Sequence, residues 1–142
     1  MTIGTILNRS ILAAGFGAAL LASPFVASQP TMAAGSVSIT GGWAGAGYVG
    51  LKAGKRENFR CKVKYGRIAG QNFSVKALCA SGSALVDQVG VLQRVANNRY
   101  VGDVHNQQFN ISARVIVSVT GQSQTVKISS SEGSATLRLK RR

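Results

Sequence analysis

Two acid–base residues of this sequence are spaced so that they could act together. Asp103 and His105 are separated by one residue, and the side chains of residues i and i+2 share one face of a strand. A carboxylate beside an imidazole can orient a general base, and a nearby serine would complete a nucleophilic triad. However, no serine here lies in a nucleophile elbow. The pattern therefore indicates a surface pair, and we expect no catalytic residues, no enzymatic activity and no cofactor.

The cysteines are a second pair with defined chemistry. Cys61 and Cys79 are the only two cysteines of the chain, and an even count in an exported protein predicts a structural disulfide. Their spacing excludes a CxxC redox motif. We expect no metal site either, because His105 is the only other soft ligand. A disulfide that closes a loop of this length contributes about 3 kcal/mol in the chain-entropy treatment.

Basic residues are in large excess. The chain carries a formal net charge of +13, with 17 basic residues against four acidic ones. An apolar core does not require this excess, so it indicates either an anionic partner or a solvated basic surface. Strand spacing places several basic residues on one face, and a second group lies near the C-terminus. The candidate anion-binding residues are Arg60, Lys62, Lys64, Lys76, Arg138 and Lys140.

The partner expected for these residues is an anionic polysaccharide, lipopolysaccharide or the outer-membrane surface. Specific recognition of nucleic acid requires aromatic side chains interleaved with the basic ones. Here Phe59, Tyr65 and Phe73 alternate onto the opposite, apolar face. The sequence therefore predicts loose electrostatic binding of polyanions at most, without reading of bases.

Period-two alternation dominates the chain from Trp43 onward and predicts the elements that position these residues. Both cysteines fall on the apolar faces of successive strands, so a bridge inside the core is geometrically reasonable. The long row from Phe109 to Val119 is predicted to face inward. Glycines between residues 41 and 47 are expected to let the first strand bend and pass close to the sheet. Seven or eight short strands separated by turn signals predict an all-β fold, a small antiparallel up-and-down barrel or a sandwich.

Residues 1–33 fit a cleavable signal peptide. They contain Arg9, then an apolar run and small residues that permit cleavage after residue 28 or 33. The apolar run of roughly 17 residues is short for the ~20 of a spanning helix. We therefore expect a periplasmic or secreted protein that is not integral to the membrane. Residues 34–42 are predicted to be a flexible linker, and residues 43–142 a single antiparallel β domain.

Several short motifs resemble those of a family of small exported alphaproteobacterial β-proteins. That family opens with W-x-G-x-G, has one cysteine pair and has no assigned function. The corresponding segments here are residues 43–47, 57–61, 79–81, 102–104, 124–128 and 137–139. A looser likeness is to the lipocalin-like periplasmic metalloprotease inhibitors, which also have an early tryptophan and one disulfide. In those inhibitors the N-terminal segment enters the protease cleft, which implies that role for residues 29–42.

These observations predict a non-catalytic exported envelope protein whose basic β domain binds an anionic envelope component or has a structural role. Two alternatives remain open at this stage. One is a periplasmic protease inhibitor of lipocalin-like fold. The other is a carrier of a small apolar ligand, because a β-barrel of this size can enclose one.

Overall fold

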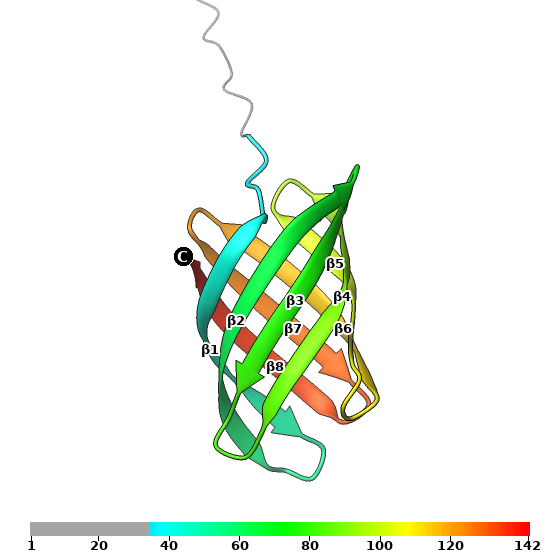
Figure 1. The fold of residues 1–142 in the computed structure, drawn as a ribbon. Coiled ribbons are helices and arrows are strands. Elements are labelled where there is room, and N and C mark those ends of the chain that lie inside the picture. The colour runs from blue at the N-terminus through cyan, green and yellow to red at the C-terminus, as the bar shows by residue number, and fades with distance from the viewer. Residues whose placement is uncertain (1–34) are drawn as a thin grey trace, which may run out of the picture. The chain divides into compact units, whose positions relative to one another are not determined.

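The computed structural model describes residues 35–142, which form a closed antiparallel β-barrel (Figure 1). Each strand pairs with the next along the chain, and the last strand pairs with the first. The predicted all-β, up-and-down barrel is confirmed. The predicted signal peptide lies outside the described residues. The strands are β1 (Gly41–Leu51), β2 (Arg56–Ala69), β3 (Asn72–Ala80), β4 (Leu85–Ala96), β5 (Arg99–Asn106), β6 (Ile111–Thr120), β7 (Ser123–Ser130) and β8 (Gly133–Arg141).

The alternating sequence pattern sets which face of each strand is buried. In β2, Cys61, Val63 and Tyr65 are buried, whereas the basic residues between them are exposed. The same holds in β6, where the buried row runs from Ala113 to Val119. Antiparallel strands with one face in the core and one in water show this alternation. Within residues 35–142 there is no helix long and apolar enough to cross a membrane.

Some apolar side chains are exposed instead of facing the core. Phe109 was predicted to begin the inward row of β6, but it lies in the turn before that strand and is 48% exposed. Asn106 holds this turn, because its side-chain oxygen accepts a hydrogen bond from the Phe109 N–H at 2.6 Å. In β4, the outward positions include Leu85, Val89 and Val91, which are all exposed.

Glycines let β1 pass close to β8. A Cβ atom on Gly45 would lie 2.0 Å from the Arg138 carbonyl oxygen, and one on Gly47 would lie 2.0 Å from the Thr136 oxygen. No side chain fits at such distances, so the close approach requires glycine at both positions. The predicted close passage of the first strand is confirmed at these two residues.

The segment before β1 closes one end of the barrel. Ile39 is fully buried, and its carbonyl oxygen accepts a 2.8 Å hydrogen bond from the Trp43 indole. The Tyr100 hydroxyl donates to the Val37 carbonyl at 3.0 Å. The Arg141 guanidinium donates to two carbonyls of the segment and lies over the Trp43 ring, 4.4 Å from its centroid. We call residues 37–40 the plug.

Much of the predicted flexible linker, residues 34–42, is part of the folded barrel. Gly41 and Gly42 belong to β1, and residues 37–40 are held by the contacts just described. Apolar Ile39 is buried, and Val37 partly buried, only once the barrel end exists, so a local pattern does not reveal these positions. Protease inhibition through residues 29–42 stays a prediction, and residues 29–34 lie outside the described part of the chain.

Large side chains fill the barrel beside the plug. Trp43, Phe73 and Tyr100 are buried here, and the rings of Phe73 and Tyr100 meet edge to face with centroids 5.3 Å apart. Two buried polar side chains lie in this half: the Gln124 amide donates to the Tyr65 hydroxyl at 3.3 Å. Burial raises the pKa of Tyr65 well above its ordinary value.

Candidate functional site

The end of the barrel away from the plug holds a cavity of about 220 Å³ that is partly open to solvent. β1 shows why this half is hollow: it begins at the filled end with Trp43 and ends at the cavity with the smaller Val49 and Leu51. Small inward residues of other strands, such as Ala113 and Ala135, also leave space. The apolar lining residues are Val49, Leu51, Phe59, Val86, Phe109, Ile111, Ala113, Ile128, Ala135 and Leu137.

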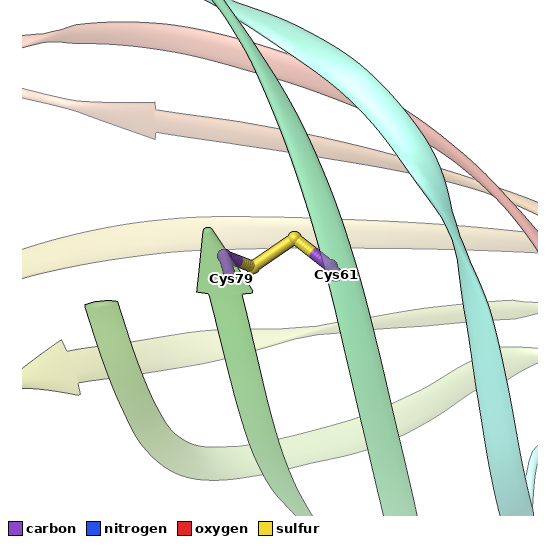
Figure 2. The surroundings of a disulfide bond; sticks show 2 residues. All are labelled: Cys61 and Cys79. Atoms are coloured by element: carbon purple, nitrogen blue, oxygen red, sulfur yellow. A yellow bond between two sulfur atoms is a disulfide. The ribbon is translucent and has the colours of Figure 1, made fainter. Parts of the chain in front are cut away.

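The disulfide joins two neighbouring strands (Figure 2), and both of its cysteines line the cavity. Cys61 of β2 and Cys79 of β3 lie directly opposite each other in the strand register, with Cα atoms 4.1 Å apart. Both are buried, so the bridge lies on the inner face, as the alternation predicted. The predicted disulfide is confirmed, and its presence is consistent with an oxidising compartment.

Polar side chains reach the cavity at few points. Asn106 is 3% exposed, and its amide donates to the Asp87 carbonyl oxygen while its own oxygen holds the turn that carries Phe109. Gln88, Ser130, Glu132 and Ser134 are the other polar residues of the lining, and Glu132 is exposed at the end of the barrel. The wall is therefore mainly apolar, with a polar rim. Such a lining suits a ligand with an apolar body and a polar end.

Near the same end of the barrel, a hydrogen bond ties β2 to the turn after β3. The Ser83 hydroxyl donates to the Glu57 carboxylate at 2.8 Å. This bond, with a further one from Ser81, lowers the pKa of Glu57. The turn is thereby attached to the strand that carries Phe59 of the cavity wall.

The basic candidates gather on the outer surface of the barrel. Lys64 of β2 and Lys76 of β3 are directly opposite each other. Ala46 of β1 pairs with Arg60 on one side and with Arg138 on the other. Ala44 lies in the same way between Lys62 and Lys140. All of the candidates are exposed. We call these residues the basic band: Arg60, Lys62, Lys64, Lys76, Arg138 and Lys140.

Pairing of β1 with β8 is what joins the two basic groups that are separate in the sequence. The side chains of Ala44 and Ala46 are short, so the surface between the long cationic side chains of β2 and β8 is recessed. We call this recessed surface the alanine floor. Tyr48, further along the same outer face of β1, is 41% exposed and has the Arg56 guanidinium 3.7 Å from its ring centroid. Tyr48 was not among the predicted site residues, although its alternation with Ala44 and Ala46 would have placed it on this face.

Asp103 and His105 share an outward face, as predicted, but each is engaged by a different residue of β6. Asp103 forms a 2.9 Å salt bridge with Arg114, and His105 Nδ1 lies 3.0 Å from the Ser112 hydroxyl. These are cross-strand partners in the sheet register. Among residues 35–142, no three His, Cys, Asp or Glu side chains gather into a possible metal site.

Comparisons with known proteins identify similar folds but no family. No protein-family model matches the chain, and no curated protein matches it. Among solved structures, the chain is similar to mFAP1, a redesigned β-barrel bound to DFHBI, with 12% identity over 72% of this chain and 94% of that chain and a TM-score of 0.62. It is also similar to mFAP0, again a redesigned barrel bound to DFHBI (11% identity, 72% and 97% coverage, TM-score 0.60).

A third similar structure is a fluorescence-activating β-barrel that was designed de novo (14% identity, 72% and 93% coverage, TM-score 0.57). At such low identities the likeness shows the fold alone. The fold and the cavity together define the class: a small closed β-barrel that is filled at one end and hollow at the other.

Proposed function

We propose that this protein is a non-catalytic, exported binding protein that carries a small apolar ligand in the barrel cavity. The observation that supports this most directly is the space of about 220 Å³ with a mainly apolar wall. An engineered apolar cavity of about 150 Å³ stays dry and takes up benzene. The pocket in this barrel is larger and opens at the barrel end, so it has room for a somewhat larger ligand.

The architecture suits such a role. A closed barrel satisfies its backbone hydrogen bonds by strand pairing, so side chains can be small on one half of the interior without opening the sheet. The plug and the aromatic residues stabilise the other half. Two of the similar barrels are bound to DFHBI, which supports the idea that a barrel of this fold can be a ligand-binding scaffold.

The lining indicates the chemical class of the ligand. The wall has no charged side chain deeper than Glu132, which is exposed at the barrel end. Burial of a charge in such a wall would be costly, so the part of the ligand inside is expected to be hydrocarbon or aromatic. A hydroxyl or amine of the ligand would lie near Gln88, Ser130 and Glu132.

Native mass spectrometry and dye titration test this proposal. We expect the protein purified from its host to carry a small apolar molecule, and the emptied protein to bind the apolar dye N-phenyl-1-naphthylamine saturably at one site. Ala135→Phe fills the cavity and should weaken dye binding at least tenfold. Ala96→Phe adds the same bulk at an exposed position of β4 and should leave the dissociation constant unchanged. Absence of both a co-purified ligand and saturable dye binding would refute the proposal, as would equal weakening by the two variants.

A further inference from the structure

The outer face of β8, β1, β2 and β3 is strongly basic. Besides the basic band, it carries Arg56, and Arg142 follows β8. On the part of the chain that the structure describes, one acidic residue lies beside this face: Asp87 of the neighbouring strand β4 pairs with Leu78 and lines the same depression as Lys76. Glu57 alternates onto the other face of β2, Asp103 is on β5, and Glu132 is in the turn before β8. Asp87 is thus the one carboxylate of the described residues that lines the depressions of this face, and the basic band, Arg56 and Arg142 leave the face with a large excess of positive charge.

This face is hollowed along the strands. One depression lies beside Lys62, Lys64, Lys76 and Arg142, with Asp87 at its β4 edge. A second continues from it over Ala44 and Ala46, since it shares Lys62, Leu78 and Arg142 with the first. A third shares Ala46, Arg60 and Ala80 with the second and reaches Tyr48 and Asn58. Together they form a continuous shallow channel, which we call the basic groove.

The groove changes character along its length. At the end near Lys64 and Lys76 it is cationic, and same-face residues of a strand follow each other at about 6.6–6.8 Å. At the other end, Tyr48 supplies an exposed aromatic ring, and Asn58 and Ser81 supply amide and hydroxyl groups. Such groups form hydrogen bonds with sugar hydroxyls, and an aromatic ring offers an apolar surface with a polar edge.

We infer that the basic groove is a binding site for a linear acidic polysaccharide. The cations meet carboxylates or phosphates spaced along the polymer, and the alanine floor leaves room for sugar rings between the cationic side chains. A flat bilayer would rest on the protruding side chains and leave the floor empty. A nucleic acid would require more stacking surfaces than the single exposed Tyr48 of this groove. The site lies on the outside of the barrel and is independent of the ligand cavity.

Binding to polygalacturonate, a linear uronate polymer, tests the inference. We expect saturable binding that weakens as salt rises, with much weaker binding to neutral dextran, to phosphatidylglycerol vesicles and to single-stranded DNA. The triple variant Arg60→Glu, Lys62→Glu, Arg138→Glu should lower the affinity at least tenfold. A control with the same change in net charge, Lys55→Glu, Arg99→Glu, Lys127→Glu, alters exposed residues outside the groove and should lower it less than threefold.

A second variant separates groove shape from charge. Ala46→Phe keeps every cation but fills the floor, and it should lower the affinity for polygalacturonate at least fivefold while the thermal transition and dye binding in the cavity stay unchanged. Equal losses in the two triple variants, or full binding by Ala46→Phe, would overturn the inference in favour of general charge attraction. Tighter binding of vesicles or of single-stranded DNA than of polygalacturonate would overturn it in favour of those partners.

Discussion

At the scale of single residues, the most unusual feature is a polar pair inside the filled half of the barrel. Tyr65 and Gln124 are each 2% exposed. The Gln124 amide donates to the Tyr65 hydroxyl, but its side-chain oxygen has no hydrogen-bond partner among the described residues. The pair thus carries a desolvation cost that is only partly offset by the hydrogen bond. Ionisation of the Tyr65 phenol in this position would add a larger cost.

The raised pKa of Tyr65 predicts a loss of stability at high pH. The unfolded chain releases this proton near pH 10, whereas the folded protein keeps it to higher pH. Above about pH 10 the unfolded state therefore binds fewer protons, and the free energy of unfolding falls by up to about 1.4 kcal/mol per pH unit. Below about pH 10 the contribution is fully present. Urea unfolding at several values between about pH 8 and about pH 11.5, on either side of the ordinary tyrosine pKa, measures this slope.

Two tyrosine variants isolate the effect from the titration of lysines. Tyr65→Phe should show a smaller decline above about pH 10 than the wild-type protein. Tyr48→Phe removes an exposed hydroxyl and should keep the wild-type slope. If wild type and Tyr65→Phe declined in parallel, burial of the phenol would not be the cause.

At the scale of elements, the inner face of β1 combines one large side chain with two glycines. Trp43 fills the plug end, while Gly45 and Gly47 bring the strand against the backbone of β8. The same device occurs where β4 meets β5: a Cβ on Gly90 would lie 2.1 Å from the Asp103 oxygen, and one on Gly102 would lie 2.0 Å from the Val91 oxygen. Glycines of this kind are how a curved sheet closes into a narrow barrel.

Substitution of Gly47 tests this role of the glycines. In Gly47→Val the new Cβ would meet the Thr136 carbonyl oxygen at 2.0 Å, and backbone cannot move away as a flexible side chain can. We expect the free energy of unfolding to fall by at least about 2 kcal/mol, toward the upper part of the range for overpacked sites. Gly50→Val is the matched control on the same strand, because nothing lies within 4 Å of its added Cβ. Chemical denaturation of both variants should separate them, and similar losses would count against the close approach.

At the scale of the whole molecule, pairing of β1 with β8 closes the barrel from Trp43 to Leu51, whereas the disulfide acts at the cavity end. The bridge joins β2 to β3 at the wall of the cavity, where few large side chains fill the interior. A disulfide between residues 18 positions apart restricts the unfolded chain by about 3 kcal/mol in the chain-entropy treatment.

Removal of the disulfide should therefore destabilise the barrel without changing its fold. For the double variant Cys61→Ala, Cys79→Ala we expect a loss of about 3 kcal/mol in the free energy of unfolding, with an unchanged far-ultraviolet circular dichroism spectrum. Dithiothreitol should lower the stability of the wild type by a similar amount and leave the variant unaffected. A loss below about 1 kcal/mol would show that the bridge has little influence on stability.

Much of the molecule follows from local pattern. Alternation along β2 and β3 predicted which side chains enter the core, and it placed Cys61 and Cys79 on facing inner surfaces before any strand pairing was known. It also placed Arg60, Lys62 and Lys64 together on the outside. These predictions succeed because the direction of a side chain in a strand depends only on its own position in the alternation.

The amino-acid sequence by itself determined the strands, their inner and outer faces, the disulfide partners and the excess of positive charge, since each is a property of neighbouring residues or of composition. Only the tertiary structure decided that β8 pairs with β1, so that Arg138 and Lys140 join the basic residues of β2. It alone decided that Ile39 closes one end and that the other end is hollow. These features depend on which distant segments meet and in what register, and no local periodicity encodes such contacts.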